Sequence, residues 1–397
     1  MKLKLKNTPE QVELIAALGS RDQTVSREAQ EAFAAFVGPV LQQVIKQAST
    51  AGMIYSDMVY DEDDSPSIPL DLWYDEAAGY IQVWSQHMAG GLPTSVVEGV
   101  KEIKIATYRL DTGVTWKKQY ARKHRLDVVS KALERMAQEV LVKQERNAWA
   151  VILKALGEAQ SVSSSLAGTA LSAGKNGGHV MASYESNTGA GGTFLPHDVN
   201  RMMTFMRRLN ESFANGTPDP NNGGWGLTDL FVSPEIMELV RTFAWEPVSA
   251  VRGSGASAMG LPESARESVW RSAGMNEIYG ITLHELMELG KNQKYNVLFD
   301  DFKQAGIAHH STDDGTQGEN FSSANNELLV GLDLSKESFV RPVAQQGDHV
   351  FGSGSASTFT VLPDDQYLVR SDKVGFFGFM EEGRVCIDAR AIMGLVV

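Results

Sequence analysis

The feature that most constrains the fold of this chain is one long helical pattern in its first half. Asp127 is a good N-cap, and apolar residues follow it at the spacing of an amphipathic helix as far as Gly157, a natural stop. The pattern predicts a helix over 127–156, which at about 1.5 Å per residue is on the order of 45 Å long. Such a helix is a spine of the fold rather than a connector. Its apolar positions are Val129, Leu133, Met136, Val140, Ala148, Val151 or Ile152, and Ala155.

The closing segment of the sequence is a second strong constraint. Residues 374–397 read VGFFGFMEEGRVCIDARAIMGLVV, with apolar runs on both sides of one charged group. Terminal residues usually have few contacts to hold them, so this apolar composition indicates a buried segment. We predict two neighbouring strands, 374–380 and 384–392, joined by a turn at 381–383 and packed beside the long helix.

Composition limits the classes of protein to which the chain can belong. Its 397 residues, 43% of them hydrophobic, are enough for two or three packed units. The formal net charge of −13 argues against a protein that binds nucleic acid over its whole surface. Cys386 is the only cysteine, which excludes a disulfide framework within the chain, and its neighbours indicate a small residue in a strand. The sequence has neither a signal-peptide pattern nor a run of roughly 18 apolar residues, so we expect a soluble protein made in a cytoplasm.

Two helical patterns precede the long helix. A short amphipathic helix opens near Thr8, and a second pattern covers 26–47 with Gly38 and Pro39 in its middle. Because proline interrupts a helix interior, we expect the second helix to kink or split there. Together these helices form an N-terminal arm, 1–50, which either lies on the body of the protein or reaches to a neighbouring subunit.

Strand patterns lie between the arm and the long helix. Residues 79–86 and 100–110 are rich in β-branched and aromatic residues with partial alternation, and the sequence HMAGGLP between them is typical of a turn. We predict a long two-stranded hairpin with largely polar faces. Such a hairpin is marginal alone and needs a surface to lie on.

Charge is segregated in the same region of the sequence. No lysine or arginine occurs between Lys46 and Lys101, where acidic residues are frequent, and the sign reverses from Lys101 to Arg125. The two blocks are either solvated faces or complementary surfaces that meet on neighbouring subunits, where complementary charge fixes register more than affinity. The candidate contact residues between subunits are Asp61, Glu62, Asp63, Asp64, Lys101, Lys104, Arg109, Lys117, Lys118, Arg122, Lys123 and Arg125.

The sequence after the long helix mixes short helices and strands. Leu195 and Pro196 begin one helix, and Ser233 caps another that has Pro234 at its first position. The order of elements shows no internal repeat and no regular alternation of strand and helix, which indicates an α+β fold. Strands are expected in LTDLFVS (227–233), near 278–283 and 295–299, and in ELLVGLDLSKESFVRPV (327–343).

The sequence offers no anchor for catalysis. It lacks a phosphate-loop motif, a dinucleotide-binding glycine motif, H-E-x-x-H and a nucleophile elbow. The best metal-like cluster is His309, His310, Asp313 and Asp314, because imidazoles and carboxylates are ligands for divalent ions. The surrounding AHHSTDDGTQGENFSS has loop composition without a rigid element, which favours a solvated loop. We therefore expect no enzyme, no cofactor and no metal ion.

The order of the parts carries a resemblance to a known family. The segments concerned are EAFAAFVGPVLQQVIKQAS in the arm, RLDVVSKALERMAQEVLVKQERNAWAVILKAL in the long helix, LTDLFVSPEIMELVRTF after it, and the closing VGFFGFMEEGRVCIDARAIMGLVV. In this order they resemble the major capsid proteins of tailed bacteriophages, which have the Hong Kong 97-type fold. The resemblance covers nearly the whole chain from about residue 25, and it rests on order and local pattern rather than on a short invariant motif.

The resemblance implies a division of the chain into four parts. They are an N-terminal arm at 1–50, an extended β-hairpin loop at 66–112, an axial domain at 206–345, and a peripheral domain. The peripheral domain takes 51–65, 113–205 and 346–397 and includes the spine helix at 127–156.

The resemblance also implies assembly. In such proteins the hairpin lies across an adjacent subunit, and hexamers and pentamers close into an icosahedral shell around double-stranded DNA. The implied partners are the chain itself, a portal protein, a scaffolding protein and a cementing or decoration protein. DNA would make only weak contact with the inner surface, which the negative charge of the chain fits. The implied location is the virion capsid, assembled in the cytoplasm of a bacterial host.

Two features of some family members are expected to be absent. Certain capsid proteins link neighbours through a hairpin lysine and a C-terminal asparagine. Lys101 and Lys104 are candidate lysines, but no asparagine follows Asn326, so we expect no such cross-link. The short arm also favours the absence of a cleaved N-terminal scaffolding segment.

Three other functions stay open at this point. One is an encapsulin-like bacterial compartment shell, and another is a different virion part such as a tail protein. The third, from a different class, is a metal-dependent hydrolase that uses the cluster of His309, His310, Asp313 and Asp314.

Overall fold

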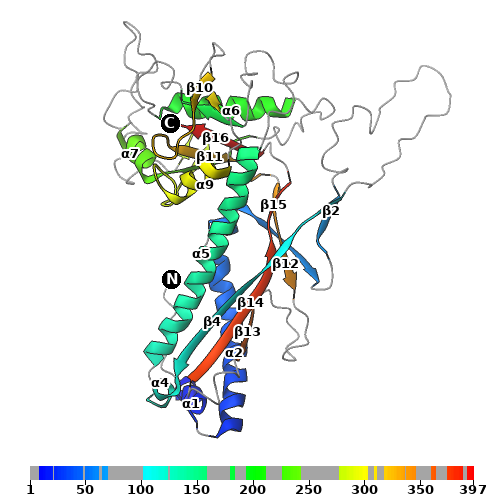
Figure 1. Cartoon of the computed structure of the whole chain (residues 1–397), viewed down its shortest axis with the longest axis vertical. Helices are drawn as coiled ribbons and strands as arrows, with labels where there is room; N and C mark the ends of the chain where they lie inside the picture. Colours follow the sequence, from blue (N-terminus) through cyan, green and yellow to red (C-terminus); the bar gives the residue numbers. More distant parts are fainter. Residues whose placement is uncertain are drawn as a thin grey trace, which may run out of the picture. The chain divides into compact units, whose positions relative to one another are not determined.

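The structure, a computed structural model (Figure 1), contains two compact units. The first unit consists of Met1–Tyr74, Glu98–Ala148 and Phe339–Val385, and the second of Asp75–Val97, Trp149–Ser338 and Cys386–Val397. Each unit is therefore assembled from segments that are far apart in the sequence. The structure describes residues 9–20, 22–47, 50–61, 65–69, 102–123, 126–158, 179–183, 194–211, 226–242, 277–302, 308–310, 317–335, 337–345, 359–363, 373–387 and 391–397.

A long antiparallel ladder runs through the first unit. β4 (Thr107–Lys117) and β14 (Lys373–Gly383) pair along all 11 residues of each strand. Three shorter strands extend this sheet. Two of them, β12 and β13, pair with β14, and the third, β1, pairs with β12. They are β13 (Thr360–Pro363), β12 (Phe339–Gln345) and β1 (Ser56–Asp61), and the two-residue β15 (Val385–Cys386) pairs with β12.

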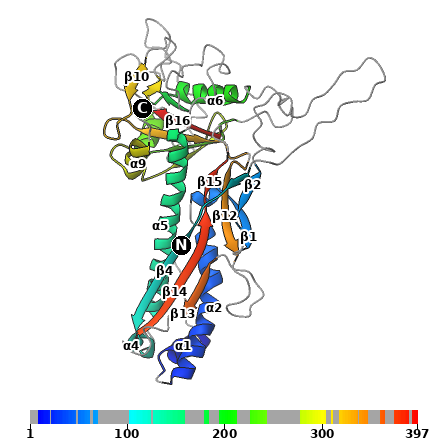
Figure 2. The ribbon, with the colours of Figure 1, turned by 45° about the vertical axis from the view of Figure 1, so that its right-hand side comes forward.

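Helices cover one face of this sheet and form the core of the first unit with it. The long helix is α5 (Leu126–Glu158), which confirms the helix predicted from the sequence, although Asp127 and Gly157 lie just inside its ends rather than capping it. Figure 2 shows α2 lying lengthwise along the antiparallel strands β4 and β14. The buried residues of this core come from α5 (Val129, Leu133, Met136, Ala137, Val140), from the ladder (Trp116, Val374, Phe376, Met380) and from the N-terminal helices (Ile15, Leu18, Ala29, Phe33, Ala34).

The N-terminal helices therefore lie on the body of their own subunit over the part that the structure describes. They are α1 (Pro9–Leu18) and α2 (Gln23–Gln47), with α4 (Lys118–Arg122) next to α1. The predicted kink or split at Gly38 and Pro39 is not a split, because α2 is one helix of 25 residues; the kink stays a prediction. Phe33 of α2 contacts Phe376 of β14, with 5.2 Å between ring centroids. Packing of this kind stabilises a helix more than local propensity does.

The closing segment differs from its prediction. β14 continues as strand through residues 381–383, so the predicted turn is wrong. The second predicted strand is also wrong, because β15 ends at Cys386 and the final strand, β16 (Ile392–Val396), belongs to the sheet of the second unit. Two adjacent glutamates normally indicate a solvated turn, but here one of them, Glu382, is fully buried among cationic and hydroxyl partners.

The predicted hairpin is only partly within the described residues. β2 (Ser67–Pro69) pairs antiparallel with β3 (Glu102–Lys104) in a separate two-stranded sheet. The strand predicted at 100–110 is divided: its second part belongs to β4, whose described partner is β14 rather than a hairpin strand. The strand predicted at 79–86 lies outside the described residues.

The second unit is built on a mixed sheet with the end of the chain in its interior. β16 lies between β5 and β11, and all five residues of both β11 and β16 are buried. The sheet order is β10 (Gln317–Asn320), β9 (Ala308–His310), β5 (Val180–Ala182), β16, β11 (Leu328–Leu332), β6 (Asp229–Val232), β8 (Ile281–Glu285) and β7 (Glu277–Ile278).

Two helices of the second unit agree with their predictions from the sequence, and a third was predicted as a strand. α6 (Pro196–Glu211) and α7 (Pro234–Thr242) begin where predicted, and Ser233 Oγ accepts a hydrogen bond from the Ile236 amide at 3.2 Å. The strand predicted at 295–299 is wrong, since this segment is α9 (Lys294–Phe302). Its buried aromatic residues Tyr295 and Phe299 are four apart, which is the helical spacing. In the part of the chain that the structure describes, no helix combines the length and the apolar character that a bilayer span requires.

Candidate functional site

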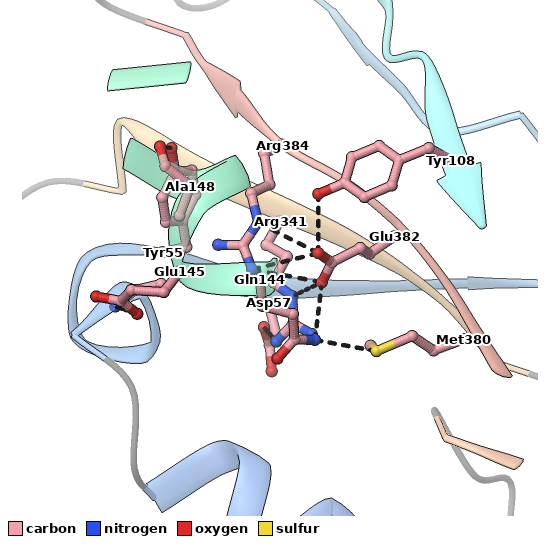
Figure 3. A network of polar contacts seen from close by, with 11 residues as sticks. Tyr55, Asp57, Tyr108, Gln144, Glu145, Ala148, Arg341, Met380, Glu382 and Arg384 are labelled. Carbon is pink, nitrogen blue, oxygen red and sulfur yellow. Dashed lines mark hydrogen bonds and ion pairs between the residues drawn. The ribbon is translucent and has the colours of Figure 1, made fainter. Parts of the chain in front are cut away.

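The most strongly organised polar group in the described structure surrounds Glu382 of β14 (Figure 3). Its side chain has no solvent exposure, and it receives hydrogen bonds from residues of four other positions in the first unit. Tyr108 Oη of β4 donates to Oε1 at 2.8 Å, and Arg341 Nε of β12 donates to Oε2 at 2.8 Å. Gln144 Nε2 of α5 donates to Oε2 at 3.3 Å, and Arg384 Nη2 lies 3.4 Å from both oxygens.

The charges around Glu382 compensate one another. Arg341 also contacts Asp57 of β1, with 3.2 Å between Nη1 and Oδ1. Burial raises the pKa of Tyr108 to about 12, with Glu382 as the next cause, so this hydroxyl stays a proton donor at any physiological pH. Burial alone would lower the pKa of Arg384, but the negative Glu382 and the neighbouring tyrosines raise it above its ordinary value. The guanidinium of Arg384 lies over the Tyr55 ring, 4.9 Å from its centroid.

This arrangement connects elements rather than performing chemistry. Protein donors occupy both oxygens of Glu382, and the group is buried, so the carboxylate is not presented to a substrate. One residue instead joins the ladder, β12 and the long helix. A buried carboxylate with these partners is a structural centre, and breaking it leaves uncompensated charge.

The adjacent Glu381 performs a related role on the other face of the sheet. Thr107 Oγ1 donates to its Oε1 at 2.6 Å, and Tyr60 Oη of β1 lies 3.3 Å from the same oxygen. The start of β1 is held to α5 in a similar way, because Tyr55 Oη donates to the Ala148 carbonyl at 3.0 Å. Sequence reasoning missed both glutamates. The available signal was Arg341 inside the apolar run FVRPV, since an arginine in a buried strand needs a carboxylate partner.

The structure gathers some of the predicted contact residues between subunits at one end of the first unit. Lys117 ends β4, Lys118 begins α4, and Arg122 and Lys123 close it. Lys117 and Lys123 are exposed, whereas Lys118 is buried. Arg122 Nε donates to the Gly19 carbonyl at 2.8 Å, which joins α4 to the end of α1.

The other predicted contact residues lie elsewhere. Lys104 is exposed at the end of β3, and Asp61 is exposed at the end of β1. Arg109 of β4 is exposed as well, but Nε contacts Asp111 Oδ1 at 2.7 Å and its guanidinium lies 4.2 Å from the centroid of the Phe379 ring. Glu62, Asp63, Asp64, Lys101 and Arg125 are outside the described residues.

Sequence reasoning also missed Lys373, the first residue of β14. The ladder places it directly opposite Lys117, although the two residues are 256 positions apart in the chain (373 − 117). No local pattern gives the pairing partner of a distant strand, so this neighbour becomes visible only in the sheet register.

The metal-like cluster is not established by the structure. The backbone of His309 and His310 forms part of β9, whereas Asp313 and Asp314 are outside the described residues. Among the residues that are described, no group of three or more histidine, cysteine, aspartate or glutamate side chains is arranged to hold a metal ion.

Comparison with known proteins finds similarity to solved structures. No protein-family model matches the chain, and no curated protein matches its sequence. Several of the solved structures to which the chain is similar are phage capsid structures, the class that the sequence resembles. One is the capsid structure of the cyanophage P-SCSP1u, with 12% sequence identity, 86% of each chain covered and a TM-score of 0.49.

Two further structures show the range of these similarities. The capsid of an empty GTA particle is 14% identical, with 87% of this chain and 89% of that chain covered and a TM-score of 0.44. A virus-like particle from Pyrococcus furiosus is 9% identical, with 91% of this chain and 99% of that chain covered and a TM-score of 0.41.

Proposed function

We propose that this chain is a major capsid protein, which assembles with copies of itself into an icosahedral shell around double-stranded phage DNA. The observation that carries the proposal is the return of the chain at β14 to the unit that contains residues 126–148 of the long helix. There β14 pairs along its whole length with β4, the strand in which the predicted hairpin segment ends. This order of arm, hairpin segment, long helix, mixed unit and returning strand is the order that the sequence resemblance implies.

The physical character of the first unit supports the same proposal. A shell subunit has to transmit force between neighbours without changing shape, which favours long regular elements packed on each other. The unit provides an 11-residue ladder packed against residues 126–148 of α5, and Glu382 joins the ladder to that part of the helix. The polar centre is closed by protein partners, whereas an enzyme places its charged groups where a substrate can reach them.

The proposal extends to the parts of the shell. We assign the first unit to the peripheral region and the second unit to the axial region, and the segment between β2 and β3 to the hairpin that contacts a neighbouring subunit. The further proposed partners are a portal protein, a scaffolding protein and a decoration protein, with packaged DNA in weak contact. Because no asparagine follows Asn326, the shell is proposed to hold together without a lysine–asparagine cross-link.

Electron microscopy of the expressed full-length chain tests this function. We expect negative-stain images to show closed shells or rings of five and six subunits, and size-exclusion chromatography to show particles far larger than one chain of 43.3 kDa. Controls are the same preparation in denaturant and an unrelated protein purified in parallel. A chain that stays monomeric over a wide range of concentration and salt would contradict the proposal, if it does so both alone and when co-expressed with the proposed partner proteins.

A further inference from the structure

Positive charge is concentrated where β4 ends, α4 follows and β14 begins. Lys117 and Lys373 face each other as direct partners in the ladder, and Lys117 is exposed. Their neighbours Trp116 and Val374 are buried in the core, so alternation along the strands puts both lysines on the outer face. Like charges directly opposite each other across an antiparallel pair are destabilising. The isolated subunit therefore carries an unfavourable pair at this position.

The subunit does not neutralise this pair within its described part. Together with Lys123, exposed just after α4, the two residues make up a group that we call the lysine end: Lys117, Lys123 and Lys373. None of the three forms an ion pair with a described carboxylate. Asp22, in the turn before α2, accepts hydrogen bonds at Oδ1 from the Thr24 amide and hydroxyl at 3.1 and 2.9 Å.

The same chain contains a segment of the opposite charge. Asp61 to Asp64 are four successive acidic residues within a stretch, from Lys46 to Lys101, that has no lysine or arginine between its ends. Asp61 is exposed at the end of β1, whereas Asp57 at the start of this strand is already paired with Arg341. The free acidic charge is therefore at the end of β1 that leads into residues 62–64.

Within one copy, Asp61 is too far from the lysine end to pair with it. Asp61 is opposite Gln345 of β12, and Val343 of β12 is opposite Glu382 of β14. The antiparallel register places Gln345 level with residue 380 of β14, about seven residues from Lys373. At about 3.3 Å per residue this is on the order of 23 Å along the ladder, well beyond the reach of an ion pair.

We infer that the lysine end of one subunit binds the acidic run 61–64 of a second copy of this chain. The inference rests on the proposed shell function and names the charged contact between two of its subunits. Such a contact orients subunits and raises their rate of association. Duplex DNA is a competing polyanion, but the net charge of −13 and the small number of lysines favour a protein segment.

The test uses a substitution that should stabilise the unassembled subunit and weaken its assembly. Lys373→Glu places a carboxylate opposite Lys117, which should raise the melting temperature of the unassembled subunit by roughly 1–4 °C. The same change places like charges against the acidic run, so the concentration needed for assembly should rise about tenfold or more. The matched control is Lys143→Glu on α5, an exposed lysine outside this group, which should leave assembly unchanged.

A charge swap tests whether the acidic run 61–64 is the segment that binds the lysine end. Combining Lys373→Glu with Asp61→Lys and Asp63→Lys should restore assembly to near the wild-type concentration. Wild-type assembly with normal assembly of Lys373→Glu would overturn the inference while leaving the shell function intact. Failure of the charge swap to restore a Lys373→Glu defect would overturn the acidic run as the occupant.

A binding measurement keeps the inference testable if the wild-type chain does not assemble, an outcome that counts against the shell function alone. A synthetic peptide of residues 57–66 should bind the unassembled subunit, and Lys373→Glu or Lys117→Glu should weaken that binding about tenfold. Equal binding of the peptide to wild type and variants would contradict the inference. So would loss of duplex DNA binding, rather than peptide binding, in the variants.

Discussion

Single residues in this protein act by compensating charge inside the first unit. Glu382 receives donors from β4, β12 and α5, and its partners Arg341 and Arg384 are themselves buried. A buried ion pair contributes little relative to apolar residues of the same shape, but removing one member is costly. The residue therefore specifies which strands and which helix come together.

Replacing Glu382 should destabilise the first unit strongly. Glu382→Leu leaves Arg384 without its carboxylate partner and Arg341 with Asp57 alone, and we expect a loss of about 3–5 kcal/mol in the free energy of unfolding. Urea unfolding followed by far-ultraviolet circular dichroism measures it. The triple variant Glu382→Leu, Arg341→Met and Arg384→Met should recover most of the loss. The control is Glu381→Gln, on the more exposed face, with an expected change below about 1 kcal/mol. A Glu382→Leu loss no larger than the control loss would contradict this role.

A second buried carboxylate, that of Glu327, makes the stability of the second unit depend on pH. Burial raises the pKa of Glu327 above 4.5, against the hydrogen bond that Ser233 Oγ donates to Oε2 at 2.9 Å. The folded state thus binds its proton more tightly than the unfolded state, so Glu327 stabilises the fold below the ordinary pKa and this contribution is lost as pH rises through the folded pKa. Glu327→Gln should therefore stabilise the second unit at pH 7 and lose this advantage towards pH 4. Thermal melts of both proteins across that range measure the difference, and a pH-independent difference would contradict the assignment.

At the scale of elements, the ladder of β4 and β14 depends on where its glycines lie. A side chain at Gly378 would place Cβ 2.7 Å from Cζ of Phe359, whereas at Gly113 the nearest atom is the Phe376 carbonyl oxygen at 3.8 Å. Gly378 pairs with Thr112, next to Gly113, so the two glycines belong to the same part of the ladder but face different environments. Gly378 lets the aromatic ring of Phe359 approach the strand, whereas no side chain comes as close to Gly113.

The two glycines provide a matched pair of substitutions. Gly378→Ala should lower the free energy of unfolding by roughly 1–3 kcal/mol, because the Phe359 ring has to move. Gly113→Ala should be neutral or stabilising by up to about 1 kcal/mol, because glycine costs conformational entropy in a strand interior. Denaturant unfolding of both variants gives the comparison. Equal effects would show that steric fit at Phe359 does not determine the ladder.

For the whole molecule, the main consequence of the topology is that both units need the last part of the chain. β14 completes the ladder of the first unit, and β16 lies between β5 and β11 in the second. Contacts between residues so distant in sequence form late, because closing a long loop costs entropy before the contact stabilises it. Each unit therefore reaches its final sheet only when the closing segment has been placed.

Removal of the last strand should unfold the second unit and leave the first unit folded. Deleting residues 391–397 removes β16 and exposes the edges of β11 and β5, so amide protection in the second unit should fall to near that of the unfolded chain. Protection in the β4–β14 ladder should persist, since Lys373–Gly383 is intact in this variant. Hydrogen exchange with mass spectrometry measures both regions, with the full chain as control. Equal loss of protection in both units would contradict their separate organisation.

What the sequence by itself determined are the features that depend on local pattern. The helical spacing from Asp127 to Gly157 gave the long helix, and the Ser233 cap gave the start of α7, because capping and periodicity are properties of neighbouring residues. The short aromatic segment of α9 was wrongly predicted as strand, since spacing over five residues does not separate the two structures. The resemblance in the order of parts, rather than any motif, predicted the capsid class.

Only the tertiary structure decided which distant segments become neighbours. It divided the closing segment between two sheets, placed Glu382 beside Arg341, and set Lys373 opposite Lys117. None of these pairings follows from local sequence, because a strand has two edges and two faces, and its partner is chosen by burial over the whole sheet. The buried carboxylate and the lysine end are therefore consequences of the sheet register, which the sequence specifies only through the complete fold.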